Sequence, residues 1–251
     1  MRGGVRARLE GGAQLLGTFV QIADPAACEV MAKLGFEVLC VEAEHSCLGV
    51  ETVQRLVLAM ASTPAAALVR VAGNDPIAIA AALDAGAEGV LVPRVSTAAE
   101  AEAAVAAARF PPVGSRGLGP SRATAYGADI AGHLARANRE LLLAVQVETA
   151  QALENLHELL AVAEIDLVFV GPGDLACSLG IQDPAAAELA DTVASILTRA
   201  RAAGRLTGVF AGSPADAARW RARGAGLVIL GSDLTWLTRG AAAALAAAAA
   251  D

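Results

Sequence analysis

Lysine is almost absent from this sequence, because Lys33 is the only one among 251 residues. It lies in the segment Glu29–Gly35, which has a helical pattern and ends at a glycine. Schiff-base and pyridoxal enzymes need a lysine in the active site, and a Walker A loop needs Gly-Lys-Ser or Gly-Lys-Thr. A helix lysine suits none of these roles, so the sequence argues against all three kinds of chemistry.

Cysteine, basic charge and long hydrophobic runs are also scarce. The four cysteines show no C-x-x-C spacing, so we expect reduced, mostly buried thiols in a cytoplasmic protein. The longest apolar stretch, Gly240–Ala250, is shorter than the roughly 18 residues of a membrane span. The net charge of −7 argues against nucleic acid as a partner. With 55% apolar residues, the chain is expected to be globular rather than disordered.

Eight short apolar runs alternate with segments rich in good helix formers. Each run is continuous, which is typical of parallel strands buried on both faces. Eight strand–helix units favour an α/β fold, a single (β/α)₈ TIM barrel over residues 1–251 with an extra C-terminal helix. A doubly wound open sheet is the alternative. The expected strands are Gln14–Gln21, Glu37–Val41, Ala65–Val71, Gly89–Pro93, Leu141–Val147, Asp166–Val170, Leu206–Ala211 and Leu227–Leu230.

Helix starts are marked by capping residues placed before prolines. These are Asp24-Pro25, Asp75-Pro76, Asp183-Pro184 and Ser213-Pro214, and Thr97-Ala-Ala-Glu100 is a capping box.

Residues 110–127 and 171–183 are interpreted as long loops, which often carry function. The alanine-rich tail, Ala241–Ala250, favours helix but supplies little core, so we expect it to pack on a neighbouring subunit or to fray.

Acidic and basic side chains stand where the expected strands end. They occur in Val41-Glu-Ala-Glu-His45, at Arg70, in Gln146-Val-Glu148 and in Gly171-Pro-Gly-Asp174. In a barrel of this kind the carboxyl ends of the strands converge on one face, where catalytic groups gather. We therefore expect these side chains to share one site.

Glu148 and Asp174 are expected on adjacent strands, where two carboxylates repel each other unless a cation neutralises them. Mg²⁺ and Mn²⁺ prefer oxygen ligands and take about one or two protein carboxylates. The pair therefore predicts a divalent-metal site for Mg²⁺, Mn²⁺ or Co²⁺. The alternative is that each acid caps a helix or pairs with an arginine.

His45 is suited to acid–base work near neutral pH, and its alternative is a loop histidine paired with Glu42 or Glu44. Arg70 suits a carboxylate or an enolate oxygen, and its alternative is a buried ion pair with one of the same two acids. The other histidines, at 133 and 157, lie in polar helical segments and are expected on the surface.

The turn Gly171–Asp174 predicts free N–H groups at Gly173 and Asp174, which would hold a small carboxylate of the substrate. Arg116 and Arg122 fall in the long stretch 110–127. They would either rim an acidic substrate or form surface ion pairs.

In this order and spacing, the motifs resemble the HpcH/HpaI aldolase family, the metal-dependent class II pyruvate aldolases that include 4-hydroxy-2-oxoheptanedioate aldolase. The resemblance extends from about Gly17 to Leu237. The matching pieces are Glu42–His45, Val69–Val71, Leu83–Gly86, Val92-Pro93, Pro112–Gly117, Gln146–Thr149, Gly171–Leu175 and Ser178–Gly180.

The resemblance implies a lyase that cleaves or forms 4-hydroxy-2-oxo acids through a pyruvate enolate, with an aldehyde as the second substrate. It also implies a hexamer whose last helix packs on a neighbour. The implied roles are Glu148 and Asp174 as metal ligands, His45 as acid–base, Arg70 as enolate stabiliser, Gln146 as a keto-acid contact, and Asp84 as a catalytic partner of a histidine across a subunit contact.

One position departs from the family, which usually has aspartate where this chain has Glu42. Glutamate reaches one methylene further, so we expect a rearranged network beneath His45 or Arg70. Two other functions remain open. One is a CoA-thioester lyase of the citrate-lyase β-subunit type, which resembles Asp-Leu-Glu-Asp at positions 42–45, and the other is a non-catalytic keto-acid-binding protein.

Overall fold

Eight parallel strands close into a barrel in chain order, with β8 pairing back to β1. The structure, a computed structural model, describes residues 4–183 and 185–249. The predicted (β/α)₈ barrel is confirmed, and an open sheet is excluded by the closure. The strands are β1 (Leu15–Val20), β2 (Val38–Glu42), β3 (Ala66–Arg70), β4 (Gly89–Val92), β5 (Leu142–Val147), β6 (Leu167–Val170), β7 (Leu206–Ala211) and β8 (Leu227–Ser232).

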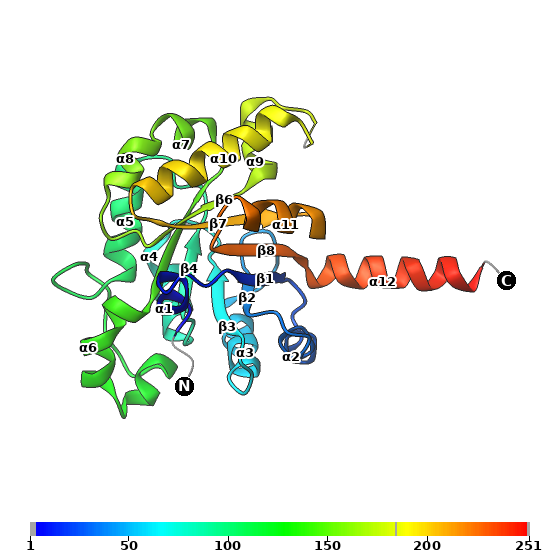
Figure 1. Ribbon diagram of the computed structural model, residues 1–251. Coiled ribbons are helices and arrows are strands. Elements are labelled where there is room, and N and C mark those ends of the chain that lie inside the picture. The colour runs from blue at the N-terminus through cyan, green and yellow to red at the C-terminus, as the bar shows by residue number, and fades with distance from the viewer. Residues whose placement is uncertain (1–3, 184, 250–251) are drawn as a thin grey trace.

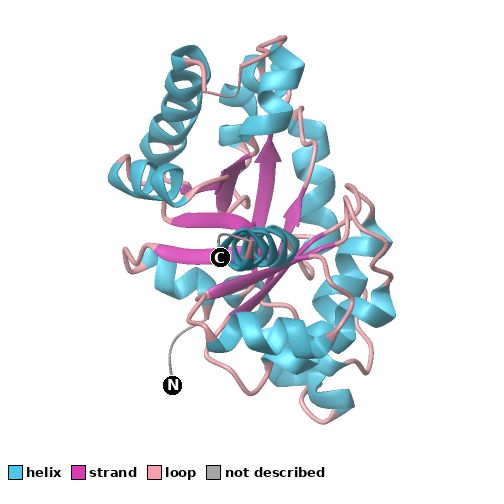
Figure 2. Cartoon of the chain, turned by 90° about the vertical axis from the view of Figure 1, so that its right-hand side faces the viewer, coloured by secondary structure: helices cyan, strands magenta, loops and turns pink. Residues whose placement is uncertain are grey.

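The strands bury both of their faces, which is why they read as continuous apolar runs. One set of side chains, including Leu15 and Phe169, packs together inside the barrel. The other set, including Val41 and Val145, packs against the surrounding helices. Figure 2 shows this arrangement, with the helices on the outside and the strands within.

Four of the five helix starts that the sequence marks are confirmed, and they belong to α2, α4, α5 and α11. Asp24, Asp75 and Ser213 each accept a backbone N–H of the first turn, and Thr97 forms its capping box. The start predicted at Asp183-Pro184 is wrong, since the helix begins at Ala187, and Pro184 lies outside the described residues. The helices are α1 (Val5–Glu10), α2 (Pro25–Lys33), α3 (Val50–Met60), α4 (Pro76–Asp84), α5 (Ala98–Ala108), the 3₁₀ helix η1 (Arg122–Gly127), α6 (Ile130–Glu140), α7 (Ala150–Glu154), α8 (Leu156–Ala161), α9 (Pro172–Leu179), α10 (Ala187–Ala202), α11 (Pro214–Ala222) and α12 (Asp233–Ala248).

The stretch after β6 is a helix rather than the predicted loop. α9 begins directly after Gly171, with Pro172 at its first position, and ends at Gly180 in the left-handed conformation with φ of 73°. Proline fits the first turn of a helix because the N–H it lacks has no partner there. The other long stretch, 110–127, contains η1 and packs against α4 and α6.

The extra C-terminal helix, α12, is attached by its first turn and then extends away from the barrel (Figure 1). The carboxylate of Asp233 accepts the backbone N–H of Gln21 at 3.0 Å, and Trp236 Nε1 donates to Thr18 Oγ1 at 3.1 Å. Further along, the side chain of Leu245 is 73% exposed. Within residues 4–183 and 185–249, no helix combines the length and hydropathy needed to cross a membrane.

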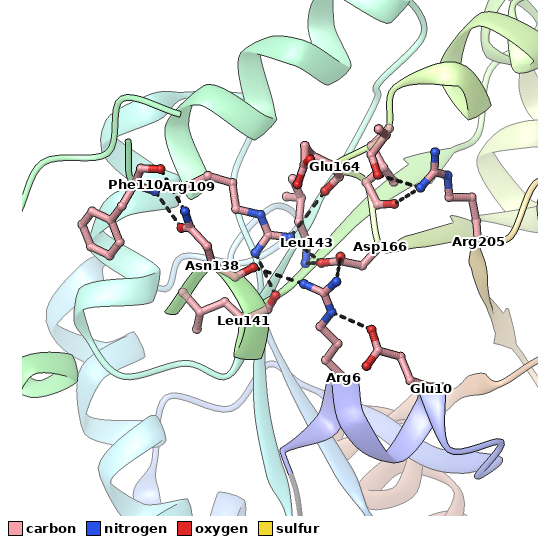
Figure 3. A network of polar contacts seen from close by, with 12 residues as sticks. Arg6, Glu10, Arg109, Phe110, Asn138, Leu141, Leu143, Glu164, Asp166 and Arg205 are labelled. Atoms are coloured by element: carbon pink, nitrogen blue, oxygen red, sulfur yellow. Dashed lines mark hydrogen bonds and ion pairs between the residues drawn. The ribbon is translucent and has the colours of Figure 1, made fainter. Parts of the chain in front are cut away.

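A buried polar network ties together the starting ends of β5 and β6 (Figure 3). Arg109 is 1% exposed and donates to Leu141 O at 2.9 Å and to Asp166 Oδ2 at 2.5 Å. Arg6 of α1 approaches the second oxygen of Asp166 at 3.0 Å. Burial raises the pKa of Asp166, while the charge of Arg109 lowers it. The network therefore joins α1, α5 and two strands at the end where β5 and β6 begin.

The single lysine and the four cysteines do not line the cavity at the barrel mouth. Lys33 is exposed at the end of α2 and pairs with Glu29 at 2.6 Å, outside the barrel mouth. All four cysteines are free, but only Cys28 and Cys40 are buried, so the expectation of mostly buried thiols holds for two of them. Burial raises the pKa of Cys28 to about 12, which keeps this thiol protonated and unreactive.

Candidate active site

A cavity of about 340 Å³ opens at the carboxyl ends of the strands. This volume is at the small end of the roughly 300–1,000 Å³ typical of ligand pockets. Its lining combines charged and polar groups from several strands with aromatic side chains. The lining residues are Phe19, Gln21, Glu42, His45, Arg70, Gln146, Phe169, Gly171, Pro172, Gly173, Asp174, Phe210, Gly231, Ser232 and Thr235.

Glu42 and Arg70 form a buried ion pair at the ends of β2 and β3. Arg70 Nε donates to Glu42 Oε2 at 2.6 Å, and its Nη2 contacts the same oxygen. The other oxygen, Oε1, accepts the backbone N–H of Glu44 at 2.8 Å and of His45 at 3.0 Å. Glu42 therefore fixes both the guanidinium and the backbone that leads to His45. That these contacts differ from those of the family aspartate stays a prediction.

The side-chain atom Oε2 of Glu44 is buried between Arg70 and His45 and has no hydrogen-bond partner among the described residues. This atom lies 3.4 Å from Arg70 Nε and 3.7 Å from His45 Nε2. Burial raises the pKa of Glu44, the charges of Arg70 and His45 lower it, and Glu42 and Asp174 raise it again. The imidazole of His45 lines the cavity and is 58% exposed.

Arg70 keeps its charge in this setting. Burial lowers its pKa, but the hydrogen bond and charge of Glu42, with the charge of Glu44, outweigh burial and raise the pKa. The guanidinium also lies 4.5 Å above the ring of Phe19. The buried ion pair with Glu42 is therefore observed, and Arg70 also lines the cavity. Its role at an enolate oxygen stays a prediction.

Glu148 and Gln146 lie side by side at the end of β5. Gln146 Nε2 donates to Glu148 Oε2, and the backbone N–H of Arg94 donates to Glu148 Oε1 at 2.7 Å. Arg94 has a φ of 56°, a left-handed conformation that is strained for a non-glycine residue. A Cβ at Gly171 would lie 2.9 Å from Gln146 Nε2 and 3.0 Å from Glu148 Oε2, so a larger residue there would displace these two side chains.

The first turn of α9 faces the same cavity. Gly173 and Asp174 line it, and their N–H groups belong to the turn that has no intrahelical partners. The predicted turn with free N–H groups is therefore the N-terminus of a helix, whose dipole favours an anion.

A divalent cation fits these residues. Burial raises the pKa of Glu148, the hydrogen bonds from Gln146 and Arg94 lower it, and the charges of Glu44 and Asp174 raise it further. The Oε1 atom of Gln146 is buried without a partner. In the described part of the chain, no cluster of three or more His, Cys, Asp or Glu could hold a metal by itself. Two carboxylates with substrate or water as the other ligands match the preference of Mg²⁺.

Three predicted residues lie away from the cavity. Asp84 ends α4 and pairs with Arg116 Nη2 at 2.6 Å, so within one chain it does not contact His45. Arg116 is buried rather than at a substrate rim, and Arg122 Nη1 donates to Ala85 O at 3.2 Å. Neither arginine is among the cavity-lining residues, so the interpretation that they rim a substrate is wrong for the single chain.

His133 is buried, although its helix is polar, so the expectation of a surface position is wrong. It packs edge-on against Phe110, with ring centroids 5.6 Å apart. Sequence reasoning also missed the polar cavity residues at or just after the ends of β1 and β8, namely Gln21, Ser232 and Thr235. These are uncharged polar residues of common types. The serine that caps α12, Ser232, is the signal that could have located two of them.

Known proteins match the chain over nearly its whole length. The sequence is 37% identical to a 4-hydroxy-2-oxo-heptane-1,7-dioate aldolase from Salmonella dublin, over 97% of this chain and 93% of that one. It is 37% identical to a hydroxypyruvate/pyruvate aldolase from Roseovarius nubinhibens, over 96% of this chain and 95% of that one.

A solved structure agrees with these relatives. A HpcH/HpaI aldolase/citrate lyase family protein from Burkholderia cenocepacia J2315 superposes with a TM-score of 0.92 at 33% identity, covering 97% of this chain and 98% of that one. The sequence model of the family described as HpcH/HpaI aldolase/citrate lyase matches residues 15–239. The chain therefore belongs to the HpcH/HpaI aldolase/citrate lyase family, and it is an enzyme of the carbon–carbon lyase class.

Proposed function

We propose that the chain is a divalent-metal-dependent aldolase that interconverts a 4-hydroxy-2-oxo acid with pyruvate and an aldehyde. The observation that carries this proposal is the convergence of Arg70, His45 and Asp174 on one cavity. Glu148 is hydrogen-bonded to the lining residue Gln146 and lies close enough to Asp174 for their charges to interact. Family membership supports the same reaction type. Glu148 and Asp174 would hold the cation, which when bound supplies Lewis-acid polarisation of the keto group.

The residues of the chain supply the remaining steps. The N–H groups of Gly173 and Asp174 and the side chain of Gln146 bind the keto acid at the cavity floor. In cleavage, His45 takes the proton from the C4 hydroxyl, and the C3–C4 bond breaks with its electron pair moving to C3. The aldehyde leaves, and Arg70 stabilises the oxygen of the pyruvate enolate until C3 takes up a proton.

The absence of a suitable lysine supports the metal route over a Schiff base. The only lysine side chain is on α2 and is paired with Glu29. Pyruvate activation at this site therefore relies on electrostatic stabilisation rather than on an iminium.

We also propose a cytoplasmic homo-oligomer, a hexamer, in which α12 packs on a neighbouring subunit and Asp84 approaches a histidine of another copy. The exposed leucines of α12 and the position of Asp84 outside its own cavity support this assembly. Light scattering of the purified protein measures the number of copies directly, and a monomer would contradict the proposal.

Exchange of the pyruvate methyl protons in D₂O, followed by NMR, tests the proposed chemistry without a choice of aldehyde. Metal-stripped protein is compared before and after addition of Mg²⁺. We expect exchange only with Mg²⁺. Absence of exchange under both conditions would refute pyruvate enolisation and favour the CoA-thioester lyase or a binding protein, which CoA affinity then separates.

A further inference from the structure

The cavity has a charged side and an uncharged side. The charged side carries Glu42, Arg70 and Asp174, which come from β2, β3 and α9. Strands β7, β8 and β1 are neighbours in the barrel. The cavity residues on these strands and on the segments that follow them therefore lie next to one another. This uncharged side consists of Phe19, Gln21, Phe210, Ser232 and Thr235.

The cavity offers little to a second carboxylate. Arg70 is the one guanidinium among the described lining residues, and Glu42 and Glu44 already contact it. A divalent cation would balance Glu148 and Asp174, but bound pyruvate then adds its own negative charge. An acceptor that carries a carboxylate would therefore meet an unfavourable field.

Asp233 adds a carboxylate next to the uncharged side. Its buried carboxylate accepts the backbone N–H of Gln21 at 3.0 Å and of Ile22 at 2.9 Å. These partners are peptide groups rather than an arginine, so the Asp233 carboxylate lies within hydrogen-bond distance of the Gln21 backbone with no cation among these partners.

The chemistry of the uncharged side suits a small polar molecule. Phe19 and Phe210 stack with ring centroids 6.0 Å apart and form an apolar wall beside Arg70. The side-chain amide of Gln21 makes no hydrogen bond to any described residue, and the Thr235 hydroxyl lies 3.1 Å from Ser232 Oγ. Amide and hydroxyl groups bind the hydroxyls of a ligand without requiring charge.

We propose that the uncharged side is the acceptor subsite and that it selects a short, uncharged hydroxyaldehyde over an aldehyde that bears a carboxylate. This inference rests on the proposed aldolase function. The aldehyde carbonyl would face the enolate on the charged side, and its substituent would lie between the Phe19–Phe210 wall and the polar groups of Gln21 and Thr235.

Matched pairs of aldehydes test the proposal with the Mg²⁺-loaded enzyme and pyruvate. 4-Oxobutanoate and its methyl ester are close in length but differ in charge. We expect kcat/KM for the ester to exceed that for the acid by about tenfold, because unpaired like charges oppose binding. Glycolaldehyde and propanal are close in size, and we expect a preference of about threefold or more for the hydroxylated member.

Variants at one position then assign the preference to the uncharged side. Gln21→Arg supplies the missing cation and is expected to lower the ester-to-acid ratio about tenfold. Gln21→Met is similar in length and uncharged, and it is expected to keep the wild-type ratio. Thr235→Arg gives a second reading if Gln21→Arg does not fold.

The outcomes separate this inference from the proposed function. Equal or better use of 4-oxobutanoate by the wild type, or a ratio unchanged in both arginine variants, would overturn the acceptor subsite while Mg²⁺-dependent proton exchange of pyruvate persists. Loss of that exchange in the wild type would instead refute the proposed function and, with it, this subsite.

Discussion

Replacing Glu42 by glutamine tests how much the buried pair with Arg70 stabilises the fold. The side chain of Glu42 is 1% exposed, and its two oxygens accept Arg70 Nε at 2.6 Å and two backbone N–H groups at 2.8 Å and 3.0 Å. In Glu42→Gln, one carboxylate oxygen becomes an NH₂ group, which donates hydrogen bonds. This group then faces other donors, either the Arg70 guanidinium or the two peptide N–H groups. The change therefore leaves a buried charge without its main partner.

The expected loss follows from the contacts that remain. Breaking a buried ion pair costs about 3–5 kcal/mol. Glu44 stays 3.4 Å from Arg70 Nε and offsets part of the loss, so the lower end of that range applies. For a chain of this size, about 1 kcal/mol moves Tm by about 2–4 °C. We therefore expect Tm to fall by about 6–12 °C, measured by circular dichroism without metal.

Glu42→Asp is the control, because it keeps the charge and shortens the side chain by one methylene. The shorter carboxylate can contact the guanidinium or the two N–H groups but not both. Because it keeps the negative charge near Arg70, we expect a smaller loss of stability than in Glu42→Gln. If Glu42→Gln unfolds within about 2 °C of the wild type, or if both variants lose equally, charge pairing is not what Glu42 contributes.

Four further outcomes are expected. Asp174→Ala should abolish both Mg²⁺ dependence and pyruvate proton exchange, and wild-type turnover in this variant would show that the metal assignment is wrong. Burial lowers the pKa of His133 below 6.5, with the charges of Arg116 and Arg136 acting in the same direction. As the pH falls, His133 is therefore protonated in the unfolded chain before it is protonated in the folded chain. The contribution of neutral His133 to the free energy of unfolding is complete above pH 6.5 and declines as the pH falls below it. Between pH 7.5 and pH 5.5, wild-type Tm should therefore fall more than that of His133→Gln, and parallel curves would contradict this. Arg109→Met leaves Asp166 buried without its main partner and should cost about 3–5 kcal/mol, seen as a large fall in Tm, whereas an unchanged Tm would mean that water replaces the guanidinium. Removal of residues 241–251 should reduce the number of associated copies in light scattering without unfolding the barrel, and an unchanged assembly would show that the tail makes no subunit contact.

The fold was largely predictable because its physical causes act locally. Apolar runs mark all eight strands, since both faces of each strand are buried. Asp24, Asp75 and Ser213 mark helix starts because each caps the turn that its own sequence begins. α9 was missed because Pro172 and Gly173 were interpreted as loop formers, although proline is compatible with a first helical turn.

The site was predictable only in part. Arg70, Gln146 and Asp174 stand out because polar groups at the ends of apolar strands are unusual, and the structure brings them together at one cavity. The burial of His133 depends on its packing against Phe110, which belongs to a different part of the chain. The uncharged side of the cavity depends on closure of the barrel between β8 and β1, a contact that no local pattern encodes.

The lone lysine on α2 also makes the protein a convenient object for site-selective chemistry. Amine-reactive dyes have one side-chain target, Lys33, besides the α-amino group of the chain. α2 is followed by Phe36, whose ring stacks on Trp236 of α12 with centroids 6.3 Å apart. A fluorophore at Lys33 would therefore stand near the base of the projecting helix, where its emission reports whether another copy of the chain approaches that helix in solution.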